Sequence, residues 1–190
     1  MYLLCTFLFA ILAALGAAQT QPKPCNVPLI LYNGLGYDFT VNVQNSSFSF
    51  HKTPINFIQI QPTLYRSVIA GSASGTGAAL TKLRMTNNRL YLQAYGGKSY
   101  VGITQFVPPA EVFRYLRFSS AGGEELSVVA HWTCDENGTQ QIVVVPQSGG
   151  QTGLTFCVAQ DRAGTYDLSV KPAFENQNPC IDVVLAIQQA

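Results

Sequence analysis

The chain has 190 residues, of which 47% are hydrophobic and only 11% are charged, with a formal net charge of +1 at pH 7. A chain without a basic excess lacks the electrostatic attraction by which proteins bind nucleic acid or acidic membrane surfaces, so the composition excludes those partners. The length is sufficient to bury the core of one ordinary domain.

The N-terminal residues predict a secretory signal peptide. Residues 2–15 are almost entirely apolar and are followed by small residues, which is typical of cleavage near Ala18. The apolar run is shorter than the ~20 residues of a membrane-spanning helix, and no basic cluster follows it. We therefore expect a signal peptide over 1–18, a short leader over 19–24 and a single β domain over 25–190. The protein is expected to be secreted, with no membrane span.

Cysteine usage predicts two disulfides. Cleavage of the signal peptide removes Cys5 and leaves Cys25, Cys134, Cys157 and Cys180, an even number in an oxidising compartment. Of the three possible pairings we expect Cys134–Cys157, which brackets a hairpin-like unit, and Cys25–Cys180, which precede the first and the last strand. No C-x-x-C or His-rich spacing accompanies these cysteines, so we predict no metal and no cofactor.

Two N-glycosylation sequons fit a protein that passes through the secretory pathway. They are Asn45-Ser46-Ser47 and Asn137-Gly138-Thr139. Asn137 is the stronger candidate because it lies in a predicted turn. We therefore expect glycans at Asn45 and Asn137.

After the leader, short alternating segments predict strands that are separated by turn residues. The segments are 27–31, 39–43, 48–50, 58–60, 64–68, 83–85, 90–94, 101–103, 126–134, 142–145, 154–158, 166–170 and 181–187. Asn33-Gly34 predicts a hairpin that pairs 27–31 with 39–43, and Asn87-Asn88 and Asn137-Gly138 predict two further reversals. Residues 112–118 fit a strand or a helix, and we expect a strand.

About a dozen short strands without a long amphipathic helix predict one all-β domain, an antiparallel β-sandwich or barrel. A β-trefoil has a similar number of strands and is the alternative, although no threefold repeat is visible. We favour a sandwich with neighbouring termini, because a disulfide between the beginnings of the first and last strands suits two parallel neighbours.

No catalytic constellation is evident. His51 and His131 are the only imidazoles, and the adjacent acids Glu124-Glu125 and Asp135-Glu136 fall in turn-rich segments where carboxylates are usually solvated. A hydrolase would use His131 with a nearby acid, and it requires a carboxylate within reach of a histidine and a cleft between the histidines. We expect a protein that is not an enzyme. A loop over 71–77 is the place where an inhibitor of a secreted hydrolase would present a binding segment.

One basic and aromatic stretch predicts a candidate glycan-binding surface. Its members are Lys82, Arg84, Arg89, Tyr91 and Tyr95. On adjacent strands these side chains would share a face that can stack on sugar rings or contact an anionic polymer. An ordinary solvent-facing sheet surface explains the same pattern. Trp132, the only tryptophan, is a further candidate for stacking on a sugar.

Several segments together carry a family resemblance. They are LYNGLGYDF at 31–39, NRLYL at 88–92, TC at 133–134, FCV at 156–158 and PCIDV at 179–183. The pattern resembles small secreted proteins of filamentous fungi, most of them of uncharacterised function. It is loosely similar to the fungal cell-wall phialide protein and IgE-binding protein group, through the LYL segment and the two cysteines after it.

The resemblance implies a fungal extracellular or wall-associated β protein and carries over no catalytic residue. The leading expectation is thus a non-enzymatic protein that acts at the cell wall or as an apoplastic effector binding a host protein or glycan. The alternatives are a carbohydrate-binding module and an inhibitor of a secreted hydrolase, with a secreted hydrolase ranked last.

Overall fold

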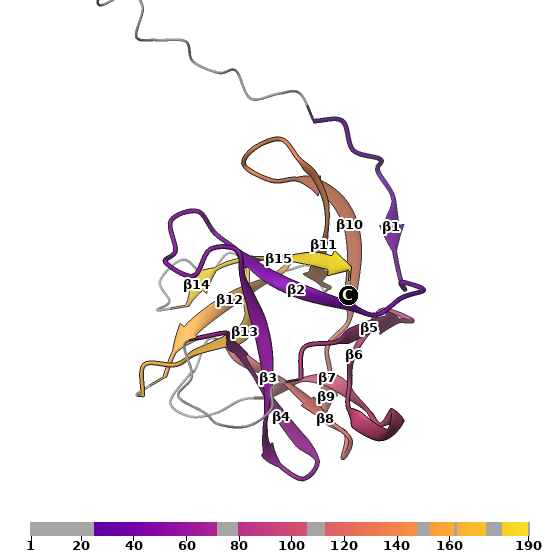
Figure 1. The fold of residues 1–190 in the computed structure, drawn as a ribbon, viewed down its shortest axis with the longest axis vertical. Coiled ribbons are helices and arrows are strands. Elements are labelled where there is room, and N and C mark those ends of the chain that lie inside the picture. The colour runs from indigo at the N-terminus through magenta and orange to yellow at the C-terminus, as the bar shows by residue number, and fades with distance from the viewer. Residues whose placement is uncertain are drawn as a thin grey trace, which may run out of the picture.

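A computed structural model describes residues 25–71, 80–105, 113–147, 153–161, 163–173 and 180–189. The predicted signal peptide and leader, and residues 72–77 of the predicted loop, lie outside the described residues. The described chain is nearly all β and forms a closed eight-stranded antiparallel barrel with extra strands (Figure 1). The prediction of an all-β domain is confirmed, with the barrel observed in place of the favoured sandwich.

The strands in chain order are β1 (Leu31–Tyr32), β2 (Phe39–Gln44), β3 (Thr53–Gln61), β4 (Leu64–Ile69), β5 (Leu83–Thr86), β6 (Arg89–Gln93), β7 (Ser99–Gln105), β8 (Arg114–Ser119), β9 (Glu124–Glu125), β10 (Val128–Cys134), β11 (Gln140–Pro146), β12 (Leu154–Gln160), β13 (Tyr166–Pro172), β14 (Ile181–Asp182) and β15 (Val184–Gln189). A single 3₁₀ turn, η1 (Tyr95–Gly97), separates β6 from β7. The strand expected over 112–118 is confirmed as β8.

The barrel closes through a ring of antiparallel pairings. Strand β2 pairs with β3 and with β5, and the circuit runs from β3 through β4, β13, β8, β7 and β6 to β5. Tight reversals allow neighbouring strands to pair, as at Asn87 and Asn88, where φ angles of 51° and 62° suit the twist of a two-residue hairpin. Closure removes the free edges that an open sheet would leave.

Alternating side chains from the strands fill the barrel. In β2, Phe39, Val41 and Val43 are buried while the residues between them are partly exposed, as period-two alternation requires. The Phe57 and Phe118 rings meet edge to face, with their centroids 5.0 Å apart at the centre of this core. The apolar alternation in the sequence therefore identified the inward faces.

A curved sheet in the order β1-β10-β11-β15-β2 extends from the barrel, and the β10–β11 hairpin projects beyond it (Figure 1). The predicted hairpin of 27–31 with 39–43 is wrong, because β1 pairs with β10 instead. The edges of β2 are already occupied by β15, β3 and β5. Leu29 and Ile30 are exposed rather than packed in a strand.

The expected disulfide pairing is also wrong, since the bonds are Cys25–Cys134 and Cys157–Cys180. Cys134 ends β10, and the N-terminal segment lies beside that strand. Cys157 lies in β12, which pairs with β13 and β14 rather than with β11, and β14 begins directly after Cys180. The two bonds therefore follow strand neighbours that are distant in sequence.

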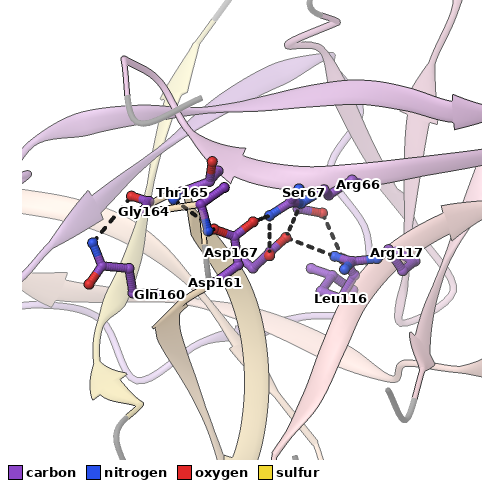
Figure 2. A network of polar contacts seen from close by, with 10 residues as sticks. Arg66, Ser67, Leu116, Arg117, Gln160, Asp161, Gly164, Thr165 and Asp167 are labelled. Atoms are coloured by element: carbon purple, nitrogen blue, oxygen red, sulfur yellow. Dashed lines mark hydrogen bonds and ion pairs between the residues drawn. The ribbon is translucent and has the colours of Figure 1, made fainter. Parts of the chain in front are cut away.

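A buried ion-pair network marks the point where β4 and β8 separate and β13 enters between them (Figure 2). Asp167 of β13, only 2% exposed, accepts hydrogen bonds from Arg66 Nε at 2.7 Å and from Arg66 Nη2 at 2.6 Å. Arg117 Nη1 of β8 donates to the same carboxylate at 3.1 Å, and Arg66 Nη2 also donates to Asp161 at 2.5 Å. Hydrogen bonds to Asp167 and Asp161 raise the pKa of Arg66, whereas burial lowers the pKa of Arg117. Asp167 thus joins three strands at one junction.

Candidate functional site

One hollow in the described part of the chain lies between β10, β11, β15 and β2, and we call it the Trp132 hollow. It encloses about 580 Å³. Its lining is mostly amide and aromatic: Tyr37, Asn42, Gln44, Lys52, Trp132, Asp135, Thr139, Gln140, Gln141, Ile142, Ile187, Gln188 and Gln189. Six of the thirteen lining side chains are carboxamides, so the hollow offers hydrogen-bond donors and acceptors with little net charge.

The hollow exists because two neighbouring strands separate. Strand β11 pairs with β15 only at Val143–Ala186 and Val144–Leu185. Beyond these pairs, β15 follows β2 as far as the Gln189–Phe39 pair, while β11 continues with β10 into the projecting hairpin. The ends of β11 and β15 therefore diverge. Ile142 and Ile187, which pack against the core, lie between the polar side chains of the opening.

The aromatic rings at the hollow are held by their neighbours. The Trp132 indole Nε1 donates a hydrogen bond to the Tyr32 hydroxyl at 3.0 Å, and the ring lies on the strand opposite Ile142. Tyr37 packs edge to face against Phe39, with ring centroids 6.4 Å apart. Because both rings are fixed by contacts outside the hollow, their positions do not depend on a ligand.

A second hollow of about 300 Å³, which we call the histidine hollow, adjoins the first. Three valines and both histidines contribute to its lining: Gln44, Asn45, Ser46, His51, His131, Thr133, Cys134, Asp135, Glu136, Gln141, Val143, Val145 and Val184. The two hollows share Gln44, Asp135 and Gln141. The sequence did not indicate that His51 and His131 would line one hollow, because they belong to elements far apart in the chain.

Polar contacts join the loop after β2 to the turn of the β10–β11 hairpin. The backbone N–H of Asn45 donates to His51 Nδ1 at 3.1 Å, so the ring proton lies on Nε2, which is 3.1 Å from Glu136 Oε1. Lys52 Nζ lies 2.7 Å from the same carboxylate oxygen. Asp135 Oδ1 accepts the N–H groups of Asn137 and Thr139 and so fixes the turn. These contacts within the protein therefore fix the rim of the histidine hollow without a ligand.

These contacts bear on the hydrolase alternative. The carboxylate within hydrogen-bond reach of a histidine is Glu136, and its partner is His51 rather than the expected His131. Both ring nitrogens of His51 are engaged. His131 Nδ1 donates to the carbonyl of Trp132 at 2.9 Å, and within the described residues no carboxylate bonds to it. A carboxylate beside a histidine and a cleft lined by both histidines are thus present. The carboxylate pairs with His51, whose two ring nitrogens are both engaged, and not with His131.

The predicted glycan-binding stretch does form one outward surface, in which Arg84 of β5 lies directly opposite Tyr91 of β6. Its arginines are paired, with Arg84 Nε 2.7 Å from Asp38 and Arg89 Nη2 2.7 Å from Glu125. Tyr95 is 81% exposed in η1, and Lys82 is exposed just before β5. None of the five predicted residues lines either hollow. The two arginines of this surface are thus charge-compensated, and Arg89 lines a smaller hollow of about 250 Å³.

The two sequons lie in different environments. Asn137 is exposed in the turn of the β10–β11 hairpin, where the prediction placed it. Asn45 is partly buried, and its Nδ2 donates to the carbonyl of Asp182 at 2.7 Å. Asn45 also lines the histidine hollow. The preference for Asn137 as the modified residue remains a prediction.

Comparison with known families, curated proteins and solved structures found no match to this chain. Within the described ranges, no cluster of histidine, cysteine, aspartate and glutamate is arranged to hold a metal ion. Those ranges also contain no helix with the length and apolarity of a membrane span. The site must therefore be interpreted from its own geometry and chemistry.

Sequence reasoning named Trp132 as a candidate but missed the amides around it. The signal was present as two adjacent glutamine pairs, Gln140-Gln141 and Gln188-Gln189, each at the end of a strand. Glutamines at strand ends are common on protein surfaces. The two glutamine pairs come together in one hollow because β11 and β15 are antiparallel neighbours in the sheet.

The contact between Lys52 and Glu136 predicts an unusual titration. The hydrogen bond from Lys52, with smaller contributions from a backbone N–H and His51, lowers the pKa of Glu136 to about 2. The folded-state pKa lies below the unfolded value, so the contact is fully present above the ordinary glutamate range and is lost as the pH falls toward 2. We expect carboxyl-carbon NMR to find this low pKa, and Lys52→Ala to move it back toward its ordinary value. An ordinary pKa in the unmodified protein, or no change in Lys52→Ala, would contradict this assignment.

Proposed function

We propose that the protein is a secreted, non-enzymatic binding protein whose ligand is a neutral glycan held in the Trp132 hollow. In the setting that the fungal resemblance implies, it acts at the cell wall or in the extracellular space of a host. The observation that carries the proposal is the combination of a fixed indole ring with six carboxamide side chains in one hollow.

This combination matches the surface chemistry of a sugar. A sugar ring presents hydroxyl groups that both donate and accept hydrogen bonds, and each carboxamide supplies two donors and an acceptor. The apolar C–H face of the ring packs against an aromatic side chain. Sites for small ligands generally combine apolar surface with a few well-placed polar groups, as Ile142, Ile187 and the surrounding amides do here.

Charge in the hollow is balanced, which favours an uncharged ligand. Its charged lining groups are Lys52 and Asp135, whose Nζ and Oδ2 atoms lie 3.9 Å apart. A strongly anionic polymer would be attracted by one lysine and repelled by the nearby carboxylate, so the hollow does not favour it. Two disulfides support the proposed extracellular location, because such bonds persist in oxidising compartments.

The proposal is tested by retention of the oxidised protein on insoluble chitin and β-glucan, with Trp132→Ala compared with Tyr91→Ala. We expect Trp132→Ala to weaken binding at least about tenfold, the scale of a central aromatic contact, and Tyr91→Ala to bind as the unmodified protein does. A Gln188→Ala/Gln189→Ala variant removes exposed amides without touching the core, and it should also weaken binding.

Two results would contradict the proposal. If Tyr91→Ala loses binding and Trp132→Ala keeps it, the β5–β6 surface is the site. If the protein is retained by neither polysaccharide but captures one protein from host extracellular extract, its ligand is a protein.

A further inference from the structure

We propose that the Trp132 hollow and the histidine hollow form one groove, and that the ligand is a linear oligosaccharide long enough to occupy both. The inference rests on the proposed function and extends it from a sugar to a chain of sugars. It assigns the histidine hollow, for which the proposed function gives no role, as a second sugar subsite.

The two hollows are contiguous. Gln44, Asp135 and Gln141 line both. The Gln44 and Gln141 carboxamides pair with each other, each Nε2 donating to the other's Oε1 at 2.7 Å. This pair uses one donor and one acceptor of each amide and leaves the remaining donor and lone pairs for a ligand. A chain passing from one hollow to the other would cross the paired amides.

Strand β10 supplies an aromatic ring to each hollow. Successive side chains of a strand point to opposite faces, so Trp132 enters one hollow and His131 the other, and a ligand that contacts both rings passes through the gap where β11 and β15 diverge. Because His131 Nδ1 donates to the Trp132 carbonyl, Nε2 is left as an acceptor at the histidine hollow. The same strand therefore fixes the spacing between the two rings.

The histidine hollow combines apolar and polar groups, as the Trp132 hollow does. Val143, Val145 and Val184 supply apolar surface, and Val184 is 43% exposed. Thr133 and Gln141 add hydroxyl and carboxamide groups beside it. Apolar surface bordered by donors and acceptors suits a second sugar ring in the same way as the Trp132 hollow suits the first.

The groove is pre-formed. The Cys25–Cys134 bond holds the end of β10, and the contacts of His51 and Lys52 with Glu136 hold the hairpin turn above it. A rigid groove loses little conformational entropy on binding. Each further sugar unit of the oligosaccharide that contacts the groove can then increase the affinity.

The experiment is calorimetry of the oxidised protein with chito-oligosaccharides and β-glucan oligosaccharides from disaccharide to hexasaccharide. We expect the hexasaccharide of the preferred series to bind at least about tenfold tighter than the disaccharide. Val184→Trp, which fills the histidine hollow, should abolish this gain while leaving disaccharide affinity unchanged. Ile60→Trp is the matched control, because Ile60 is an exposed aliphatic residue of β3 that lines neither hollow. His131→Ala should reduce the gain without adding bulk.

The outcomes separate the two proposals. Equal affinity for short and long oligosaccharides would overturn the continuous groove. So would an undiminished increase in affinity from disaccharide to hexasaccharide in both Val184→Trp and His131→Ala. Either result would leave the proposed Trp132 site unaffected. Disaccharide binding that is insensitive to Trp132→Ala would overturn the proposed function, as would the absence of binding to both series.

Discussion

Replacing Asp167 by asparagine should lower the free energy of unfolding by about 3–5 kcal/mol, the scale observed when one partner of a buried ion pair is removed. The change preserves the size of the side chain but removes its charge. Arg117, whose side chain is 8% exposed, and Arg66, at 25%, would then share a buried region without the carboxylate that pairs with both. Because the three residues belong to β4, β8 and β13, the loss falls on the junction of the barrel (Figure 2).

Asp161→Asn is the matched control, since Asp161 pairs with the same Arg66 but is 23% exposed. Burial would raise the pKa of Asp161, but Arg66 and the N–H groups of Thr165 and Ala163 together lower it. We expect this variant to lose about 1 kcal/mol, because water can replace part of its pairing. Urea unfolding followed by tryptophan fluorescence measures both variants. A smaller loss for Asp167→Asn than for Asp161→Asn would show that the junction is not held by Asp167.

Removing the Cys25–Cys134 bond by replacing both cysteines with serine should cost up to about 5 kcal/mol, against about 3 kcal/mol for the Cys157–Cys180 bond. The difference follows from the sequence separations of 109 and 23 residues, because the longer loop restricts the unfolded chain more. The first variant would also release the N-terminal segment from β10. Chemical denaturation of the two double variants checks the order of the two losses.

The pairing itself is checked by digestion without reduction and mass spectrometry of the linked peptides. The expected products join Cys25 to Cys134 and Cys157 to Cys180. A peptide joining Cys134 to Cys157 would contradict the strand arrangement around β12, since β12 lies between β13 and β14.

The sequence predicted the local features of the fold well. The alternation of Phe39, Val41 and Val43 marked the buried face of β2, and the paired asparagines at 87–88 marked a hairpin. These signals depend only on neighbouring residues. The partner of β1 and the two disulfides could not be obtained in this way, because they depend on which distant strand occupies each edge.

The candidate site, too, combines features that depend on local sequence with features that depend on distant strands. Trp132 stood out in the sequence as the only tryptophan, but its hollow is completed by amides from β2, β11 and β15. Of the five residues predicted for the glycan-binding surface, Arg84, Arg89 and Tyr91 lie on the adjacent strands β5 and β6, whereas Lys82 precedes β5 and Tyr95 lies in η1. The neutralisation of this surface by Asp38 and Glu125 was not foreseen, since these acids join the surface only through the fold.

The most direct test of glycan binding in the Trp132 hollow uses the indole N–H signal in a ¹⁵N-correlated NMR spectrum. The chain has one tryptophan, so the signal reports on Trp132 alone. Titration with the oligosaccharide that binds best should shift this signal together with the side-chain amide signals of Gln188 and Gln189. If the oligosaccharide binds while these signals stay unchanged and those of Tyr91 and its neighbours move, the ligand lies on the β5–β6 surface and the central claim is wrong.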